Sequence, residues 1–243
     1  MIYILLPAFN ESQGIKQVLQ NISSQLSNQR HSIIVVNDGS TDNTLGILSE
    51  LQSKFNLKII SHETNQGLGS AMKTGFQYVL PVITSNDVLI VMDADNTHPV
   101  DLIPKLIKTV ERGKDIVIAS RYAPGGKEIG LSNFRKVMSK TASVLLSLVF
   151  NVKNVTDYTS GYRAYSGKIL RRAEESYGDN LVTEPGFTCM TEILIKLSKI
   201  GAQVAEDPLM LRYDFKKGPS KIKVIATILD YLRLIFKLKF SKI

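Results

Sequence analysis

Short apolar segments alternate with helix-patterned segments through the first half of this 243-residue sequence. Each apolar run has the length and composition of a buried strand in a parallel sheet. The predicted strands are Ile2–Leu6, Ser32–Val36, Leu57–Ile60, Val88–Met92 and Asp115–Ala119. The predicted helices lie near 12–27, 42–54, 69–80 and 100–112. Because parallel strands need crossover connections, this alternation predicts a three-layer α/β/α fold with a mainly parallel central sheet.

The second half of the sequence is less regular. The glycine-rich stretch Ala123–Leu131 is predicted to be a loop, and Asn133–Phe150 and Thr191–Ile200 are predicted to be helices. The uncharged run Thr141–Val152 is too short to cross a bilayer, which takes about 20 residues. The apolar C-terminal stretch is interrupted by charged residues and is not expected to span a membrane either.

The composition favours a globular protein in a reducing environment. Apolar residues make up 44% of the chain, enough for a proper core. The single cysteine, Cys189, rules out a disulfide framework within the chain, and it is expected to be a buried apolar residue. The segment that follows Met1 reads as a first strand and lacks the basic region of a signal peptide. We therefore expect a cytoplasmic location.

Positive charge is concentrated at the C-terminal end. The segment from Arg212 to Ile243 holds nine basic and two acidic residues, so it carries +7 of the net charge of +8. A nucleic-acid-binding arm would be mostly polar, whereas this segment is broadly apolar with a narrow charged stripe, so no nucleic-acid partner is expected. We predict a catalytic domain over 1–212 and a basic amphipathic segment over 213–243 that lies on the cytoplasmic membrane face. The alternative is a surface helix packed on the domain.

Two carboxylates follow the predicted strand Val88–Met92. Asp93 and Asp95 would lie at the carboxyl end of that strand, where open α/β sheets bind ligands. They are hard oxygen ligands that suit Mg²⁺ or Mn²⁺. An acidic turn is the simpler alternative. An aspartyl-phosphate phosphatase motif, in which a carboxylate is the nucleophile, also fits the pattern. An EF-hand loop is excluded, because His98 stands where that loop requires glycine.

Four further polar segments follow or border the predicted strands at the same edge of the sheet. They are Pro7–Glu11, Val36–Asp42, Asn65–Gly69 and Ala119–Tyr122. Three motifs from the second half of the sequence complete the set: Ser132–Arg135, Asp157–Arg163 and Gly218–Lys221. Each piece alone is weak evidence, but the ordered set at these spacings is specific.

This set of motifs resembles family 2 inverting glycosyltransferases of the GT-A fold. The match covers nearly the whole chain and is closest to the dolichol- and polyprenyl-phosphate mannose synthases. The resemblance implies transfer of a hexose from a nucleotide sugar to a polyprenyl or dolichyl phosphate, with GDP-mannose as the first choice of donor and UDP-glucose as the second. It also implies Mg²⁺ or Mn²⁺ as cofactor and a membrane surface as partner. The phosphatase motif normally lies on a first strand, not a fourth.

The resemblance also implies roles for individual residues. Asp93 and Asp95 would hold the metal ion, and Asp38 would bind the base. Arg121 and Arg135 would clamp the acceptor phosphate, since a planar guanidinium binds phosphate oxygens bidentately. With Asp95, these two arginines are the predicted catalytic residues. The nucleotide sugar is expected to contact Pro7, Phe9, Glu11, Asp38, Asp93, Ala94, Asp95, Arg212 and Lys221, with Ser220 beside the last of these.

Alternative functions depend on Glu192 in particular. A phosphate acceptor needs no general base, because its second pKa is about 6 and it is largely dianionic at pH 7. A transferase acting on a glycan hydroxyl would need one, and Glu192 is the candidate; otherwise Glu192 is structural or orienting. A non-catalytic nucleotide-binding membrane adaptor is a distant third function. Asp157 and Arg163 are expected either to serve the site or only to pair with each other.

Overall fold

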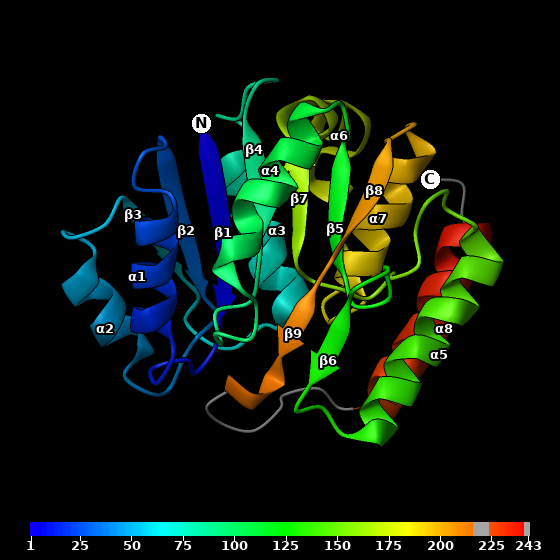
Figure 1. The fold of residues 1–243 in the computed structure, drawn as a ribbon, viewed down its shortest axis with the longest axis horizontal. Helices are drawn as coiled ribbons and strands as arrows, with labels where there is room; N and C mark the ends of the chain where they lie inside the picture. Colours follow the sequence, from blue (N-terminus) through cyan, green and yellow to red (C-terminus); the bar gives the residue numbers. More distant parts are fainter. Residues whose placement is uncertain (216–223, 241–243) are drawn as a thin grey trace.

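The computed structural model describes residues 1–215 and 224–240 and contains a seven-stranded sheet (Figure 1). The strand order is β3-β2-β1-β4-β7-β5-β8. The bounds of these strands are Ile2–Ala8 for β1, His31–Asn37 for β2, Leu57–Ser61 for β3, Val88–Val91 for β4, Ile116–Ser120 for β5, Arg163–Ser166 for β7 and Val204–Pro208 for β8. All neighbours pair in parallel except β7, which is antiparallel to both β4 and β5. The predicted mainly parallel sheet is confirmed.

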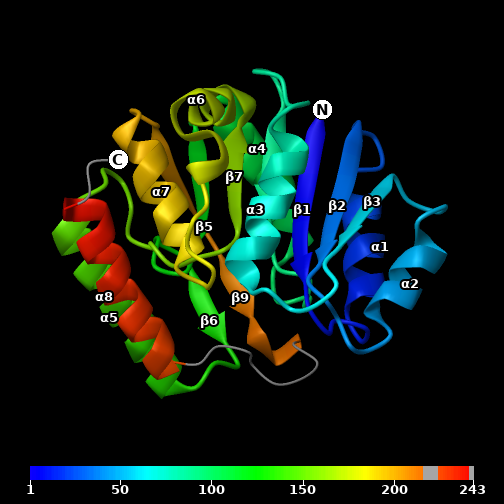
Figure 2. The same cartoon turned by 180° about the vertical axis from the view of Figure 1, so that it is seen from behind.

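Helices cover both faces of the sheet, as Figures 1 and 2 show from opposite sides. One face carries α1 (Ile15–Gln25), α2 (Thr44–Leu51) and α4 (Ile103–Glu111), the last preceded by the 3₁₀ turn η1 (Val100–Leu102). The other face carries α3 (Leu68–Val79), α6 (Gly167–Tyr177) and α7 (Cys189–Lys199), with the 3₁₀ turn η2 (Gly178–Asn180) between the last two. The four predicted helices of the first half lie where the sequence pattern places them.

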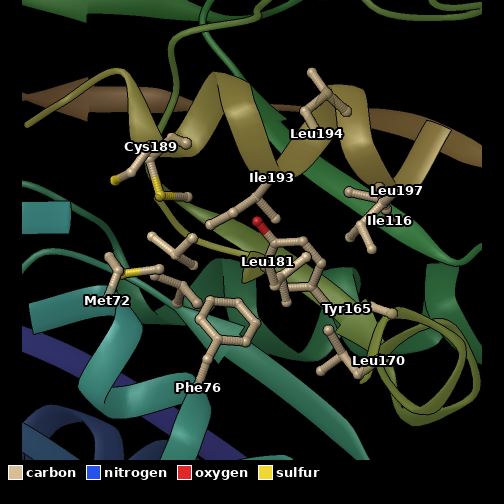
Figure 3. Close-up of a cluster of buried hydrophobic side chains, with 14 of the residues drawn as sticks. Met72, Phe76, Ile116, Tyr165, Leu170, Leu181, Cys189, Ile193, Leu194 and Leu197 are labelled. Carbon is tan, nitrogen blue, oxygen red and sulfur yellow. The ribbon is translucent and has the colours of Figure 1, made fainter. Parts of the chain in front are cut away.

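The two faces of the sheet bury separate cores because alternate residues of a strand point to opposite sides. In β1, Ile4 and Leu6 pack toward α1 and α4, whereas Leu5 packs toward α3. Figure 3 shows part of the core on the face that carries α3, α6 and α7. There, Phe76 of α3 packs edge to face on Tyr165 of β7, with 6.1 Å between ring centroids. Cys189 lies in the same core and is fully buried, which raises the pKa of its thiol. It is an apolar core residue, as predicted.

Strand β7 is the main feature that the sequence pattern did not predict. It inserts between β4 and β5, with Arg163 opposite both Val91 and Ile118. Its antiparallel direction makes the preceding segment, residues 157–162, arrive at the carboxyl ends of β4 and β5. The insertion therefore brings a second stretch of chain to the edge of the sheet that carries Asp93.

The predicted loop over Ala123–Leu131 is wrong in part. Residues Lys127–Ile129 form the short strand β6, which pairs in parallel with β9 (Met210–Arg212). A short 3₁₀ turn, η3 (Tyr213–Phe215), follows β9. Strand β6 is too short to give a periodic signal, and its partner lies far away in the sequence.

Two helices close one end of the molecule. Helix α5 has the predicted bounds, Asn133–Phe150, and lies beside α8 (Val224–Phe240) in both views (Figures 1 and 2). Helix α8 packs against α5 and α7, and it buries Leu234 and Leu238 in the core shown in Figure 3. The boundary at residue 212 stays a prediction, but the helix beyond it is packed on the domain.

Candidate active site

The predicted site segments meet at one edge of the sheet. Strands β1, β2, β4 and β5 all run in the same direction, so their carboxyl ends lie together. The segments that follow them include Phe9, Asp38, Asp93 and Arg121. The gathering of these motifs at the strand exits is therefore confirmed.

The Asp95 carboxylate is buried and oriented by the turn that follows it. Its exposed fraction is 7%, and its Oδ1 accepts hydrogen bonds from the Thr97 amide at 3.1 Å and from the Thr97 hydroxyl at 2.6 Å. The left-handed backbone of Asn96, with φ of 65°, allows the tight turn between them. The carboxylate is thus held in one direction by short local bonds.

The Asp93 carboxylate is more exposed and is flanked by His98. The Asp93 amide donates to His98 Nδ1 at 3.0 Å, which leaves the ring hydrogen on Nε2. This Nε2 lies 3.7 Å from Asp93 Oδ2, and the ring stacks on Tyr162 with 4.8 Å between ring centroids. The histidine therefore orients the carboxylate loop.

The donor set at the end of β4 fits Mg²⁺ or Mn²⁺. Both carboxylates supply the hard oxygen ligands that these ions prefer. Among the described residues, no group of three or more acidic, histidine or cysteine side chains is placed to enclose a metal ion. This agrees with the usual magnesium site, in which one or two carboxylates and substrate phosphates share the ion.

A central cavity of about 210 Å³ opens beside Asp93. Arg121 and Arg135 also line it, so three predicted site residues share one space. Most of its wall is apolar, and helices α5, α7 and α8 contribute to it with Met138, Ala142, Met190, Thr227 and Tyr231. A ligand in this cavity would therefore meet both charged groups and apolar side chains.

Arg121 is bound to carboxylates of the protein itself. Its Nε and Nη2 donate to the two oxygens of Asp157 at 2.7 and 2.6 Å, and Nη2 also donates to Thr159 Oγ1 at 2.6 Å. A weaker contact of 3.4 Å joins Nη1 to Glu128. The side chain is only 11% exposed. Its predicted contact with the acceptor phosphate stays a prediction, and the bonds in this structure fix the segment 157–160.

Arg135 is placed differently. It lies in the first turn of α5 and is partly exposed, and its described hydrogen bond is a long one of 3.5 Å from Nη1 to the Tyr213 hydroxyl. Arg212 forms a bidentate pair with Asp214 and stacks on Phe215. Ser220 and Lys221 lie outside the described residues. Arg121 and Arg135 are the two predicted phosphate-binding cations that line the cavity. Arg135 is bound to the protein more weakly than Arg121.

Four of the residues predicted to bind the nucleotide lie at the carboxyl ends of β1 and β2: Pro7, Phe9, Glu11 and Asp38. The segments that follow these two strands are tied together, because the Asn10 and Glu11 amides donate to Ser40 and Thr44. Pro7 belongs to the end of β1, Phe9 and Glu11 lie on the loop that follows it, and all three are partly exposed. Ala94, which lies between Asp93 and Asp95 in the sequence, is buried. Contact of these residues with a nucleotide sugar stays a prediction.

Asp38 organises the loop that precedes α3. Its carboxylate accepts hydrogen bonds from the Gln66 and Gly67 amides and from Asn65 Nδ2, and it lies 2.7 Å from His62 Nδ1. The side chain is almost fully buried. Its predicted contact with the base stays a prediction; in this structure both carboxylate oxygens bind the protein.

Glu192 is fully buried and does not face the cavity. Its carboxylate accepts from the Thr183 and Glu184 amides at 2.8 and 2.9 Å and from Lys196 Nζ at 2.6 Å. Burial alone would raise the pKa of this carboxyl, but Lys196 and Thr183 outweigh burial and lower it. A buried carboxylate with a lowered pKa is poorly suited to act as a general base at neutral pH.

Of the two alternatives for Asp157 and Arg163, the one in which they only pair with each other is wrong. Asp157 binds Arg121, and Arg163 is fully buried and donates to the backbone carbonyls of Met190 and Tyr158. Sequence analysis named the segment Asp157–Arg163 but not the place of its Thr159 and Gly161 in the cavity wall, and it did not name Phe187. The Asp157–Arg163 motif was the available signal, but its position depends on the unpredicted strand β7.

Comparisons with known proteins give consistent results. A sequence model described as "Glycosyl transferase family 2" matches residues 3–173. A dolichol-phosphate mannosyltransferase of Pyrococcus furiosus is 34% identical over 97% of this chain, which spans 62% of that protein. A polyprenol monophosphomannose synthase of Mycolicibacterium smegmatis is 31% identical over 85% of this chain and 75% of its own length. A UDP-N-acetylglucosamine–dolichyl-phosphate N-acetylglucosaminyltransferase of Methanococcus voltae is 29% identical over 100% of this chain and 98% of its own length.

A solved structure shares the fold. Glucosyl-3-phosphoglycerate synthase from Mycobacterium tuberculosis, in complex with Mn²⁺, UDP and phosphoglyceric acid, superposes with a TM-score of 0.68. The match covers 98% of this chain and 76% of that one, at 21% identity. The three-layer architecture of Figures 1 and 2 is therefore the GT-A fold.

Proposed function

The chain belongs to glycosyl transferase family 2, and we propose that it transfers one hexosyl unit from a nucleotide sugar to a polyprenyl phosphate. The three relatives above differ in the sugar that their names give, but all three names specify a polyprenyl-type acceptor. Two of them name mannose, so GDP-mannose is our first choice of donor. UDP-glucose is our second, and the relative from Methanococcus voltae adds UDP-N-acetylglucosamine to the donors worth testing.

The observation that carries this proposal is the composition of the central cavity. Its lining combines the charged side chains of Asp93 and Arg135 with apolar side chains such as Met138 of α5 and Tyr231 of α8. A polyprenyl phosphate has the matching chemistry, with an anionic head and an apolar tail. A soluble glycan would gain little from an apolar wall.

The two carboxylates at the end of β4 would help to bind the nucleotide-sugar donor. Asp93 and Asp95 would hold Mg²⁺ or Mn²⁺ at the end of β4, which fits their oxygen chemistry. When bound, the ion neutralises charge that develops on the departing nucleoside diphosphate. Thr97 orients the Asp95 carboxylate, whereas His98 accepts from the Asp93 backbone amide and lies 3.7 Å from the Asp93 carboxylate.

The acceptor side needs binding more than proton transfer. An oxygen of the lipid phosphate would attack the anomeric carbon and form a new C–O bond, while the C–O bond to the nucleoside diphosphate breaks and its electron pair leaves with the diphosphate. This single displacement inverts the anomeric carbon. No base is required, because the phosphate is largely dianionic at neutral pH. The burial of Glu192 agrees with a reaction that has no general base.

A direct test offers the protein several labelled donors together with a polyprenyl phosphate. The donors are GDP-mannose, UDP-glucose and UDP-N-acetylglucosamine, each with Mg²⁺ or Mn²⁺. Solvent extraction then separates lipid-linked label from free sugar. Label in the lipid phase that mild acid releases supports the proposal and identifies the donor. Label that appears only on a soluble glycan would contradict it.

Arg135→Ala is expected to impair transfer to the lipid far more than binding of the nucleotide. A charge-assisted hydrogen bond contributes about 1.5–3 kcal/mol, which corresponds to about 10–150-fold in rate. The matched control is Lys140→Ala, which removes one charge from an exposed position on the same helix. Initial rates at varied lipid phosphate give the first quantity, and calorimetry with GDP gives the second. An equal loss in both would place Arg135 in the donor site.

We also propose that α5 and α8 rest on a membrane surface. Both helices contribute side chains to the cavity lining, and both also expose large apolar side chains. We call this set the outer apolar face; it comprises Phe134, Val137, Val144, Leu145, Leu148, Leu229, Leu232 and Phe236. Over 1–215 and 224–240, no helix is both long and apolar enough to cross a bilayer. Helices with one apolar side suit the interface, and the basic residues around them favour anionic lipids.

Leu148→Ser combined with Phe236→Ser is expected to weaken binding to anionic vesicles by about tenfold or more, because each apolar side chain contributes up to roughly 1.5–3 kcal/mol when fully buried. These two side chains are 78% and 68% exposed, so the fold should survive. Deleting α8 would be a poorer test, because Leu234 and Leu238 belong to the core. Val82→Ser, at an exposed site between α3 and β4, is the control. Sedimentation with vesicles measures binding, and equal loss in the control would rule out a localised face.

A further inference from the structure

The segment 183–188, between η2 and α7, forms one wall of the central cavity together with the first turn of α7. Phe187 and Met190 line the cavity directly. Pro185 of this segment contacts the start of α3, where the Gly69 amide donates to the Pro185 carbonyl at 2.8 Å. Leu68, next to that bond, lines the cavity as well. The shape of the cavity therefore depends on how closely this segment sits against α3.

Glycines make the close contact possible. A Cβ at Gly69 would lie 1.7 Å from the Glu184 carbonyl oxygen, and one at Gly67 would lie 2.7 Å from the Pro185 oxygen. Both separations are too short for any side chain to be accommodated without movement of the backbone. The contact between segment and helix is thus a built feature of the fold.

Two helices hold the segment in place from different sides. From α7, the buried Glu192 accepts the Thr183 and Glu184 amides. From α8, Lys237 Nζ donates to Glu184 Oε1 at 2.6 Å and to Thr183 Oγ1 at 2.7 Å. The Lys237 side chain is 41% exposed, whereas that of Glu184 is 13% exposed. Through Lys237, helix α8 is thus hydrogen-bonded to the segment that forms a wall of the cavity.

We propose that Lys237 and Glu184 are positioning residues for the lipid-phosphate acceptor. Neither residue is among the described residues that line the cavity. Their pair holds Glu184 and Thr183, and through the adjoining backbone it sets the distance between Phe187 and Leu68 on the cavity wall. This inference rests on the proposed function, because the cavity is assigned there to the acceptor.

The central comparison is between Lys237→Met and Lys239→Met. Both substitutions remove one positive charge from the same end of α8, so they change membrane attraction alike. Lys239 is exposed, so its loss should not disturb the wall. We expect Lys237→Met to raise the KM for polyprenyl phosphate by about fivefold, the lower end of typical coupling between linked sites. The value of kcat should change little, because the wall contributes uniform binding.

Two further variants separate positioning from general stability. Lys237→Arg keeps a cationic donor and should restore the KM. Glu184→Gln removes the charge of the other partner of the pair and should raise the KM for polyprenyl phosphate in the same way. A merely structural role would lower the melting temperature and the active fraction, and so kcat, with KM unchanged. Equal KM values for Lys237→Met and Lys239→Met would overturn the proposal.

A fluorescence readout tests the wall without using the enzymatic activity. The sequence contains no tryptophan, so Phe187→Trp introduces a single reporter on the cavity wall. In that background, Lys237→Met should shift the emission to longer wavelength, and Lys239→Met should not. Identical spectra would contradict the inference even if the protein transfers sugar to lipid. Conversely, a wild-type protein without lipid transfer would refute the proposed function while a selective shift would still support the positioning of the wall.

Discussion

Replacing Asp95 with alanine is expected to lower transfer to polyprenyl phosphate by at least about 10²–10³-fold, as for the loss of a preorganised electrostatic group. Asp95 is the buried carboxylate of the pair and is held by two bonds from Thr97. Without it, a divalent ion would lose a charged ligand at the end of β4. The melting temperature should fall only slightly, because the change removes local hydrogen bonds worth about 1 kcal/mol each.

The matched control for this prediction is Asp95→Asn. An asparagine side chain keeps an oxygen that can accept from Thr97, but it carries no charge. If the charge matters, both variants should be inactive, and both should lose the Mg²⁺ dependence of nucleotide binding seen by calorimetry. Near-normal transfer by either variant, with Mg²⁺ present, would remove Asp95 from the metal site.

Asp157→Ala is expected to destabilise the protein by about 3–5 kcal/mol, because it removes one partner of a buried ion pair and strands the other. Asp157 is fully buried and accepts from Arg121, Thr159 and Ser160. For a protein of this size the loss corresponds to roughly 6–20 °C in melting temperature. Transfer activity should fall too, since Gly161 in the same segment lies beside Asp93. Calorimetry and activity measured at a temperature where the variant is folded separate these effects.

The Asp157 prediction has a pH signature. Burial would raise the pKa of this carboxyl, but the charge and hydrogen bonds of Arg121 outweigh burial and lower it. A lowered folded-state pKa stabilises the protein above the ordinary aspartate value of about 3.9, and this contribution is lost as the pH falls toward the folded value. The difference in melting temperature between wild type and Asp157→Asn should therefore be full at pH 7 and shrink below about pH 4. A constant difference would show that charge is not involved.

Much of the fold could be predicted because its first half is built from local signals. The run Val88–Met92 is apolar on both sides, as a strand buried on both faces must be; among the other four runs, Leu57–Ile60 departs from this, because it includes the exposed Lys58 and forms the edge strand β3. Helix α5 could be predicted with its bounds because it is long. Strands β6 and β7 could not, because each is only a few residues long and pairs with segments distant in the sequence. Short apolar runs do not reveal their partners.

The candidate site could be predicted as a set of segments but not as a set of contacts. The places of Asp93, Asp95 and Arg135 follow from the strand and helix that carry them. The bonds of Arg121 depend on Asp157, which reaches it only because β7 turns the chain back. The role of Lys237 is likewise invisible in the sequence, where it looks like one of many basic residues in the last segment.

Strand β7 has a consequence for how the chain reaches this structure. The strands β4 and β5 are made first, yet neither has its inner neighbour until Arg163–Ser166 has been synthesised and inserted. Until then, both strands present unpaired edges, which are prone to pair wrongly with other chains. Closing a sheet through contacts so distant along the chain is also intrinsically slow. The sheet cannot close until the four-residue strand that brings Asp157 to Arg121 is in place, so refolding should be more efficient at low protein concentration.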